Sequence, residues 1–474
     1  MKKNFAIALV AVFAIGLLFI WSKRPSVWGS FKNPETEQML KQFVALKEAQ
    51  AKAATKELPL EFRTIFKYAE RGNWLALSNS FNDLNERLWF LASTANGIAR
   101  RPGVRGAIED FVSETGAKFG RHWEPERPPP LRGTPGEAIK EVYGAFEGFV
   151  LGDEKYSAEF GREIMDSMPK GSVYFGGTDP GRFIITVMCQ SQQDGDTAFV
   201  ISPEPLRSVD GGMGYLQYLG GIYGKEIEVP TKADLEGCDN DFVRRLEENS
   251  KDFHDDLMGL AGPMIRMIAD KNPGRELFIE QRFPITSLYP SLEPHGLIFK
   301  INRQPLAELS DDVVRRDHDY WCKCLEPKIG GWLTNGASIE TIAAFAEKIF
   351  LRHDFKGFAG DERYVQNEYT CKMFSRERAA IGGLYAWRAE DTADPGEKKR
   401  MNEAAEFAFR QAWALCPYSS EAVYQYINLL ANQARWSDAL LVAKTAARMP
   451  ANIGPDGDAM RYVIEKLTKA QAGQ

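Results

Sequence analysis

A short stretch near the middle of the chain sets its architecture: Gly171-Ser172-Val173-Tyr174-Phe175-Gly176-Gly177-Thr178-Asp179-Pro180-Gly181-Arg182. Residues 172–175 are mostly apolar and lie between glycines, the pattern of a short buried strand. A second such run, Ala198 to Ile201, follows further along the chain. The apolar segment Phe183 to Cys189 between them suits a crossover helix or a short extended segment. Two short buried strands so separated predict a parallel βαβ unit.

Further strands and helices continue this pattern over residues 135–310. Leu277 to Ile279 and Gly296 to Ile301 are strand candidates. Met258 to Ile268 has the periodicity of a helix, although Pro263 inside it should kink or break it. We therefore expect residues 135–310 to form a small α/β domain.

The preceding residues, 26–134, have a helical pattern. Asn33-Pro34 can cap and start a helix, because the missing N–H of proline costs nothing at the first helical position. Apolar residues recur at helical spacing in Phe62 to Ala69 and again in Leu77 to Leu91. The proline-rich stretch Glu124 to Pro130 suits neither a helix nor a central strand, and it predicts a linker.

The first residues, 1–25, contain an uninterrupted apolar run from Phe5 to Trp21. As a helix this run is roughly 26 Å long, near the lower limit for crossing a bilayer. Three interpretations are open: an uncleaved membrane anchor, a cleaved signal peptide, and a buried core helix. We favour the anchor, because basic pairs flank both ends and no good cleavage site follows. The balanced basic pairs leave the orientation of the anchor open.

The C-terminal residues, 373–474, carry a repeated pattern. Ala405, Phe409 and Ala412 precede Ala439, Ala443 and Ala446 by 34 positions each, the period of tetratricopeptide repeats. Small residues at these positions let the two helices of a hairpin approach closely. We therefore expect tetratricopeptide-like helical hairpins; an ordinary helical bundle with a chance echo is the alternative. An acidic, proline-containing insertion, Ala389 to Lys399, separates an earlier helix, Ala379 to Trp387, from its partner, and residues 311–372 form a helical connector.

Several of these motifs resemble a known family. Gly171 to Asp179, Arg275 to Ile279 and Leu292 to Phe299 are similar to segments in the soluble half of large bacterial membrane proteins. The membrane half of those proteins resembles protein O-mannosyltransferases, and helical repeats follow their soluble half. The resemblance implies an extracytoplasmic location for the soluble part, and with the single apolar run Phe5–Trp21 we expect a single-pass protein of the bacterial inner membrane. Only one apolar span is present here, which weakens the case for transferase activity.

Composition and charge narrow the classes of function. The formal net charge is −6, with acidic and basic residues interspersed, whereas a nucleic-acid-binding protein needs a concentrated basic face. We therefore expect no nucleic-acid partner. No Walker A loop, G-x-G-x-x-G or G-x-S-x-G motif occurs, so the sequence indicates no cofactor and no catalytic residue. The six scattered cysteines do not settle the compartment.

Gly177, Asp179 and Arg182 are the candidate ligand-binding residues, because they follow a strand where open α/β sheets place ligands. Glycine would let a ligand approach the backbone, Asp179 could bind hydroxyls or a cation, and Arg182 could bind an anion. The alternative is a tight turn in which Asp179 caps the next helix. His318, Cys322 and Cys324 could supply metal ligands, but no fourth ligand is visible, and a half-buried helix is favoured.

Two functions from different classes remain. The first is a membrane-anchored binding or scaffolding protein, which uses its helical repeats to hold a protein or peptide partner. The α/β domain of such a protein is a candidate to hold a small ligand. The second is an enzyme or accessory subunit acting in glycan or protein glycosylation, with Asp179 in its site.

Overall fold

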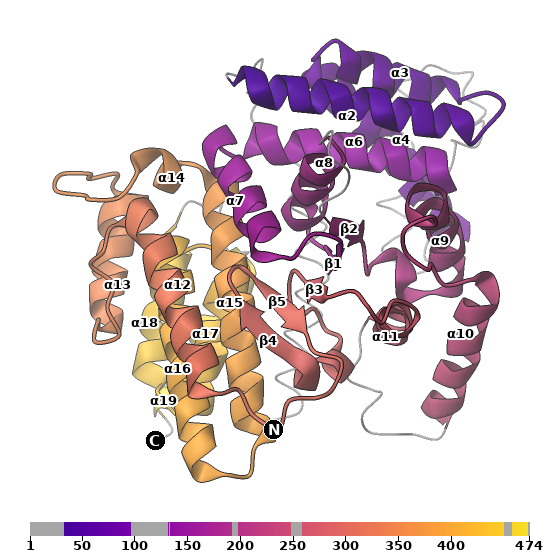
Figure 1. Cartoon of the computed structure of the whole chain (residues 1–474). Helices are drawn as coiled ribbons and strands as arrows, with labels where there is room; N and C mark the ends of the chain where they lie inside the picture. The colour runs from indigo at the N-terminus through magenta and orange to yellow at the C-terminus, as the bar shows by residue number, and fades with distance from the viewer. Residues whose placement is uncertain are drawn as a thin grey trace.

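The computed structural model of the chain describes residues 33–95, 131, 133–191, 198–247, 258–449 and 457–472. This described part is mostly helical, with a mixed sheet of five strands in the order β2-β1-β3-β5-β4. Figure 1 shows the sheet between N-terminal helices on one side and C-terminal helices on the other. No helix in these ranges is both long and apolar enough to span a bilayer. The predicted anchor Phe5–Trp21 and the linker at 124–130 lie outside the described residues.

The strands confirm the predicted parallel unit. The parallel strands are β1 (Ser172–Phe175), β2 (Ala198–Ile201) and β3 (Leu277–Ile279), and β1 lies between the other two. All residues of these strands are buried, as expected for strands covered on both faces. The crossover from β1 to β2 is helical: the π-type turn η2 (Pro180–Ile184) leads directly into α8 (Ile185–Gln190).

The remaining strands form an antiparallel hairpin at the sheet edge, β4 (Leu292–His295) and β5 (Ile298–Ile301). Gly296 has a φ of +64° in the turn, a conformation that glycine adopts without strain. The apolar pattern alone did not predict β4, because it contains Pro294. The strand tolerates this proline because it lies at the edge of the sheet, where a ladder hydrogen bond is dispensable.

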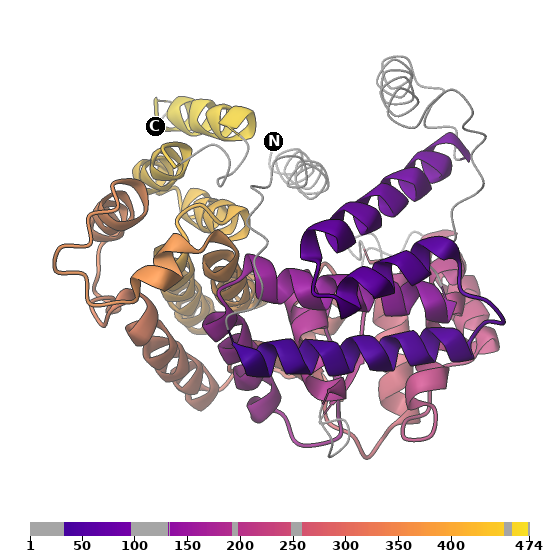
Figure 2. The same ribbon diagram turned by 90° about the horizontal axis from the view of Figure 1, so that it is seen from above.

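The N-terminal helices form a layer over the sheet. They are α2 (Pro34–Ala53), α3 (Leu60–Glu70), α4 (Trp74–Ala95), α6 (Gly133–Leu151) and α7 (Glu154–Ser167). Asn33 caps α2 as predicted, accepting a hydrogen bond from the backbone N–H of Glu35. Helix α6 is buried along most of its length, because α2, α3 and α4 cover it from outside. Figure 2 shows these indigo helices lying across α6, away from the orange and yellow C-terminal helices.

Between β2 and β3 the chain forms η3 (Pro205–Arg207), α9 (Val209–Tyr223), α10 (Lys232–Glu247) and α11 (Ala261–Lys271). The expected break at Pro263 was wrong. Helix α11 begins at Ala261, so Pro263 lies in its first turn, where a backbone N–H has no partner within the helix.

The C-terminal half is a stack of helices beside the sheet. Its elements are η5 (Thr286–Ser291), α12 (Asp311–Ile329), α13 (Ile339–Ala346), η6 (Glu347–Leu351), α14 (Glu362–Gln366), α15 (Glu368–Asp391), α16 (Pro395–Leu415), α17 (Ser420–Asn432), α18 (Trp436–Ala447) and α19 (Gly457–Ala472). From α15 to α19, each helix packs against the next. The alanines at the 34-residue spacing are all buried against neighbouring helices.

The predicted insertion at Ala389 to Lys399 was wrong in extent. Helix α15 continues to Asp391 and α16 begins at Pro395, so only a short turn separates them. Asp394 caps α16 by accepting hydrogen bonds from the backbone N–H groups of Gly396 and Glu397. Pro395 occupies the first helical position, where proline favours a helix start instead of preventing it.

Candidate functional site

The carboxyl ends of β1, β2 and β3 meet at one edge of the sheet, because these strands are parallel. Three loops leave this edge: residues 176–179 after β1, residues 202–204 after β2, and residues 280–285 after β3. Open α/β sheets bind their ligands at such an edge.

The glycine-rich loop after β1 surrounds the carboxylate of Glu280, the first residue after β3. The backbone N–H groups of Gly177 and Thr178 each donate to Oε2 of Glu280 at 2.8 Å, and the hydroxyl of Thr178 donates to Oε1. A Cβ atom on Gly181 would lie 1.9 Å from the carboxyl carbon of Glu280. The loop therefore binds an anion, and that anion belongs to the chain itself.

The three predicted ligand-binding residues do not converge on one point. Gly177 faces Glu280, whereas Asp179 is exposed to solvent and makes no capping hydrogen bond. The predicted alternative, a turn capped by Asp179, names the wrong residue. Thr178 takes the capping role, because its Oγ1 accepts a hydrogen bond from the backbone N–H of Gly181 at 3.2 Å.

Arg182, the third predicted residue, points away from the loop and into helix α6. Its Nη2 lies 2.9 Å from Oε2 of Glu137 and 3.6 Å from Oε1 of Glu141. The guanidinium also lies over the ring of Tyr215, 5.7 Å from its centroid. Arg182 does bind anions, as its type suggested, but they are carboxylates of the same chain.

A buried chain of charges runs from Arg182 to the N-terminal helices. Lys47 on α2 is fully buried, and its Nζ lies 2.5 Å from Oε2 of Glu141 and 2.8 Å from the hydroxyl of Tyr218. Burial by itself raises the pKa of Glu141, but Lys47 and Arg182 outweigh it and the pKa is lowered. Glu141 is therefore ionised. Charge pairs join α2, α6 and η2, and hydrogen bonds of Tyr218 join α9 to them.

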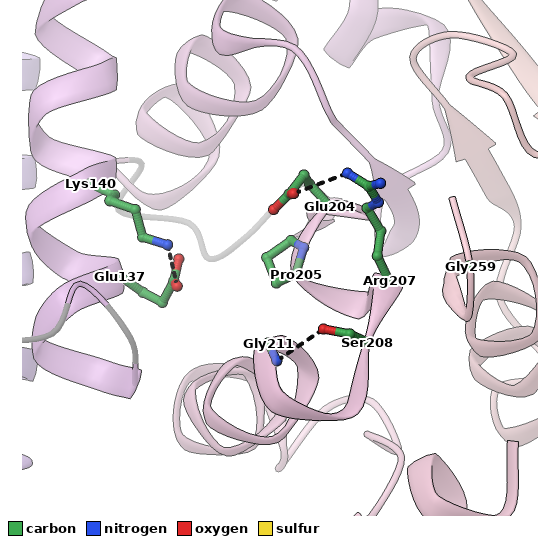
Figure 3. Close-up of a pocket in the computed structure, with 8 residues that line it drawn as sticks. All are labelled: Glu137, Lys140, Glu204, Pro205, Arg207, Ser208, Gly211 and Gly259. Carbon is green, nitrogen blue, oxygen red and sulfur yellow. Dashed lines mark hydrogen bonds and ion pairs between the residues drawn. The ribbon is translucent and has the colours of Figure 1, made fainter. Parts of the chain in front are cut away.

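The charge chain continues from Arg182 through Glu137 to Lys140, away from Lys47. At this end a cavity of about 430 Å³ opens (Figure 3). Its walls come from α6, from the continuous stretch that runs from the loop after β2 through η3 to the first turn of α9, and from Gly259. The lining residues are Glu137, Lys140, Glu204, Pro205, Arg207, Ser208, Gly211 and Gly259. Nζ of Lys140 lies 2.5 Å from Oε1 of Glu137, so the charge chain ends on the wall of the hollow. We call this cavity the edge hollow.

On its other side, Glu280 contacts the helical stack. Gln281 donates from Nε2 to Oε1 of Glu377 on α15 at 2.9 Å, and Arg282 donates from Nη2 to Oε1 of Gln425 on α17 at 3.3 Å. Oε2 of Glu377 is buried and has no hydrogen-bond partner among the described residues. Burial, followed by the nearby charge of Glu280, raises the pKa of Glu377 well above its usual value. Burial also raises the pKa of Glu280, and the hydrogen bonds from Thr178 and Gly177 oppose that shift.

The candidate metal ligands on α12 do not form a site. The ring of His318 packs edge-on against Tyr385 and Phe407, and burial lowers the pKa of His318 to about 4. Cys322 is exposed and Cys324 lies against Lys328. Across the described ranges, no group of three His, Cys, Asp or Glu side chains could hold a metal ion.

Five residues of these networks were not predicted from the sequence: Lys47, Glu137, Lys140, Glu141 and Glu280. A usable signal existed for two of them. Lys47 stands seven residues after Leu40 and four before Ala51, in the apolar stripe of its helix. Glu141 directly precedes the mostly apolar run Val142 to Val150 of the same helix, which marks it as buried and in need of a cation.

Comparisons of the chain with protein-family models, curated proteins and solved structures give no match. The function of the site is therefore inferred from its own side chains alone.

Replacing Glu280 by alanine should leave the loop donors without an acceptor. Each unsatisfied buried donor costs about 1–3 kcal/mol, so the melting temperature of the Glu280→Ala variant should fall markedly. Acetate fits the space left by the side chain and should restore the melting temperature in a saturable way, beyond sodium chloride of equal ionic strength. The matched control is Glu276→Ala, an exposed residue of the same segment. Equal acetate responses in both variants would show that the loop is no anion site.

The raised pKa of Glu377 makes the free energy of unfolding depend on pH. The pKa of Glu377 is higher in the folded than in the unfolded state. The stability that this residue contributes is therefore fully present below about pH 4.3 and is lost as the pH rises through the folded pKa. A Glu377→Gln variant removes this loss while keeping an acceptor for Gln281. Urea unfolding should therefore show a stability gain over wild type that is larger at pH 8 than at pH 5. Glu368→Gln, on the same helix, is the control, and a gain that does not grow with pH would contradict the assignment.

Proposed function

We propose that this chain is a membrane-tethered binding protein that holds a small ligand in the edge hollow. The observation that carries the proposal is the position of this cavity, beyond the carboxyl end of β2, where open α/β sheets bind ligands. Its volume of about 430 Å³ falls within the range of small-molecule sites, roughly 300–1,000 Å³. Its walls come from three separate segments of the chain, so a bound ligand would bridge them.

The tether in this proposal is the apolar run Phe5–Trp21, which precedes the first described helix α2. Its length and flanking basic residues support an uncleaved anchor. The resemblance to the soluble half of bacterial membrane proteins favours an extracytoplasmic position for the folded part, on the outer side of the inner membrane.

The C-terminal stack is, in this proposal, of the tetratricopeptide type and serves as a scaffold. The buried small residues at a 34-residue spacing support this assignment. Helices α15 and α17 hold the irregular segment Glu280–Phe283 through side-chain hydrogen bonds, much as helical repeats hold peptides. Because that segment covers part of these two helices, a protein or peptide partner would use the rest of the stack. Nucleic acid is not among the partners proposed.

The alternative, an enzyme of glycan or protein glycosylation, requires Asp179 at the site. Asp179 is exposed and does not line the edge hollow. No feature of the described residues favours this second function, and the experiment below separates the two.

A tryptophan at position 204 should fill the edge hollow and block its ligand. Glu204 is largely exposed, so the substitution should not disturb the core. In a thermal-shift screen of small metabolites, we expect a compound that raises the melting temperature of wild type but not of Glu204→Trp. Asp179→Ala is the matched control and should respond like wild type. Loss of the response in Asp179→Ala alone would favour the glycan-directed enzyme.

Cell fractionation tests the tether. The full chain should sediment with membranes, resist extraction by alkaline carbonate, and dissolve in detergent, because about 17 apolar residues hold it in the bilayer. A chain beginning at residue 26 should be recovered without detergent. Recovery of the full chain in the soluble fraction, with its first residues intact, would refute the anchor.

A further inference from the structure

We infer that Cys371 and Cys416 are the partners of a disulfide bond, which closes when the chain folds in an oxidising compartment. Both are buried thiols in the described structure, so the bond would be a modification of it. The inference rests on the proposed function in one respect. The extracytoplasmic position proposed for the folded part supplies the oxidising conditions in which disulfides form and persist.

The first support is the register of the helical hairpin formed by α15 and α16, which pack side by side and are joined by a short turn (Figure 1). The hydroxyl of Ser375 on α15 donates to the backbone carbonyl of Ala412 on α16 at 2.7 Å. The same carbonyl accepts the backbone N–H of Cys416 at 3.2 Å. Cys371 lies one helical turn before Ser375, on the same face of α15. Cys371 and Cys416 are therefore opposite each other across the hairpin.

Small residues let the two helices approach closely, as a disulfide requires, because its Cα atoms are usually about 4.4–6.8 Å apart. Midway along the hairpin, a Cβ atom on Gly382 would lie 2.9 Å from the ring of Phe409 and 3.2 Å from Cβ of Ala408. Nearer the cysteines, the hydrogen bond from Ser375 to a backbone carbonyl requires a similarly close approach. The helices therefore stay close along the hairpin, up to the end where the cysteines lie.

Tyr418, which follows α16, contacts both sulfur atoms. Its hydroxyl forms a hydrogen bond with Cys371, and its backbone N–H donates to the sulfur of Cys416. Burial raises the pKa of Cys371 well above its usual value, and the neighbouring Cys416 raises it further. Both thiols thus share one buried environment, in agreement with the register of the helices.

The other cysteines are placed differently, and all six lie within the described ranges. Cys322 and Cys324 are two positions apart on α12, so their side chains point in different directions. Cys189 and Cys238 lie on α8 and α10, outside the C-terminal stack. The pair opposed across α15 and α16 is therefore the one that the fold brings together.

The bond forms by thiol–disulfide exchange with glutathione disulfide or with an oxidoreductase that carries a disulfide. The thiolate of one cysteine attacks the oxidant and releases one thiol, and the second cysteine attacks the mixed disulfide and releases the other. The two protein thiols lose two protons and two electrons, which the two released thiols take up. Burial raises the pKa of both cysteines in the folded protein, so exchange takes place before the hairpin packs.

The test uses the full chain in a neutral detergent. The protein is first reduced and then incubated with glutathione disulfide in urea just below the unfolding midpoint, where the hairpin opens transiently. After the remaining thiols are blocked, digestion and mass spectrometry should find the peptide of Cys371 linked to that of Cys416. Without urea the link should form at least tenfold more slowly, because the folded thiols are buried. No link between these peptides, or a link from either cysteine to another one, would overturn the inference.

Stability provides a second readout. The bond closes a loop of about 45 residues and so restricts the unfolded chain, which should raise the melting temperature by several degrees over that of the reduced protein. Reduction should not change the melting temperature of Cys371→Ser or Cys416→Ser, whereas Cys322→Ser, the control at an exposed cysteine, should respond like wild type. A response to reduction in a folded Cys371→Ser protein would contradict the pairing. The mass spectrum of wild type decides the case even if the buried serine variants fail to fold.

A last arm separates the pair from the location. Cells are lysed in acid, which stops exchange, and free thiols are then blocked with N-ethylmaleimide. The link between Cys371 and Cys416 should be present in the protein recovered from these cells. If it forms in the purified protein but is absent from the cells, the pair stands and the proposed extracytoplasmic position is wrong.

Discussion

The described structure depends on the hydrogen bonds that the loop after β1 donates to the carboxyl group of Glu280. This carboxyl group belongs to the first residue after β3, accepts hydrogen bonds from the loop that follows β1, and lies beside Glu377 on α15 of the C-terminal stack. These three elements come from sequence positions more than 90 residues apart. A buried carboxyl group is costly unless donors surround it, and the loop supplies two backbone N–H groups and a hydroxyl. The arrangement therefore fixes how sheet and stack meet.

The same loop connects this interaction to the edge hollow. Gly177 and Thr178 bind Glu280, and Arg182, a few residues on, binds Glu137 and Glu141 of α6. One polar network thus fastens the C-terminal stack to the sheet, and a second fastens the N-terminal helices to it. Buried networks of this kind lower the number of alternative packings more surely than they raise stability. The edge hollow lies where the second network reaches solvent.

Much of the fold could be predicted from local pattern, because strands and helices reflect the periodicity of apolar residues. The strands β1, β2 and β3 and the cap of α2 were confirmed in place. The occupant of the glycine loop could not be predicted, since Glu280 is separated from Gly177 by 103 positions and nothing local marks their contact. The expectations at Pro263 and Pro395 were wrong, because each proline lies in the first turn of a helix and does not interrupt one. Arg182 was correctly taken as an anion binder, but local pattern could not show that its anions are internal.

Native-state hydrogen exchange at the amides of Gly177 and Thr178 tests the central role of Glu280 most directly. The account predicts that both amides are strongly protected in wild type, and that Glu280→Ala abolishes this protection while the strand amides of β1 stay protected. Rapid exchange at Gly177 and Thr178 in the wild-type protein would contradict it.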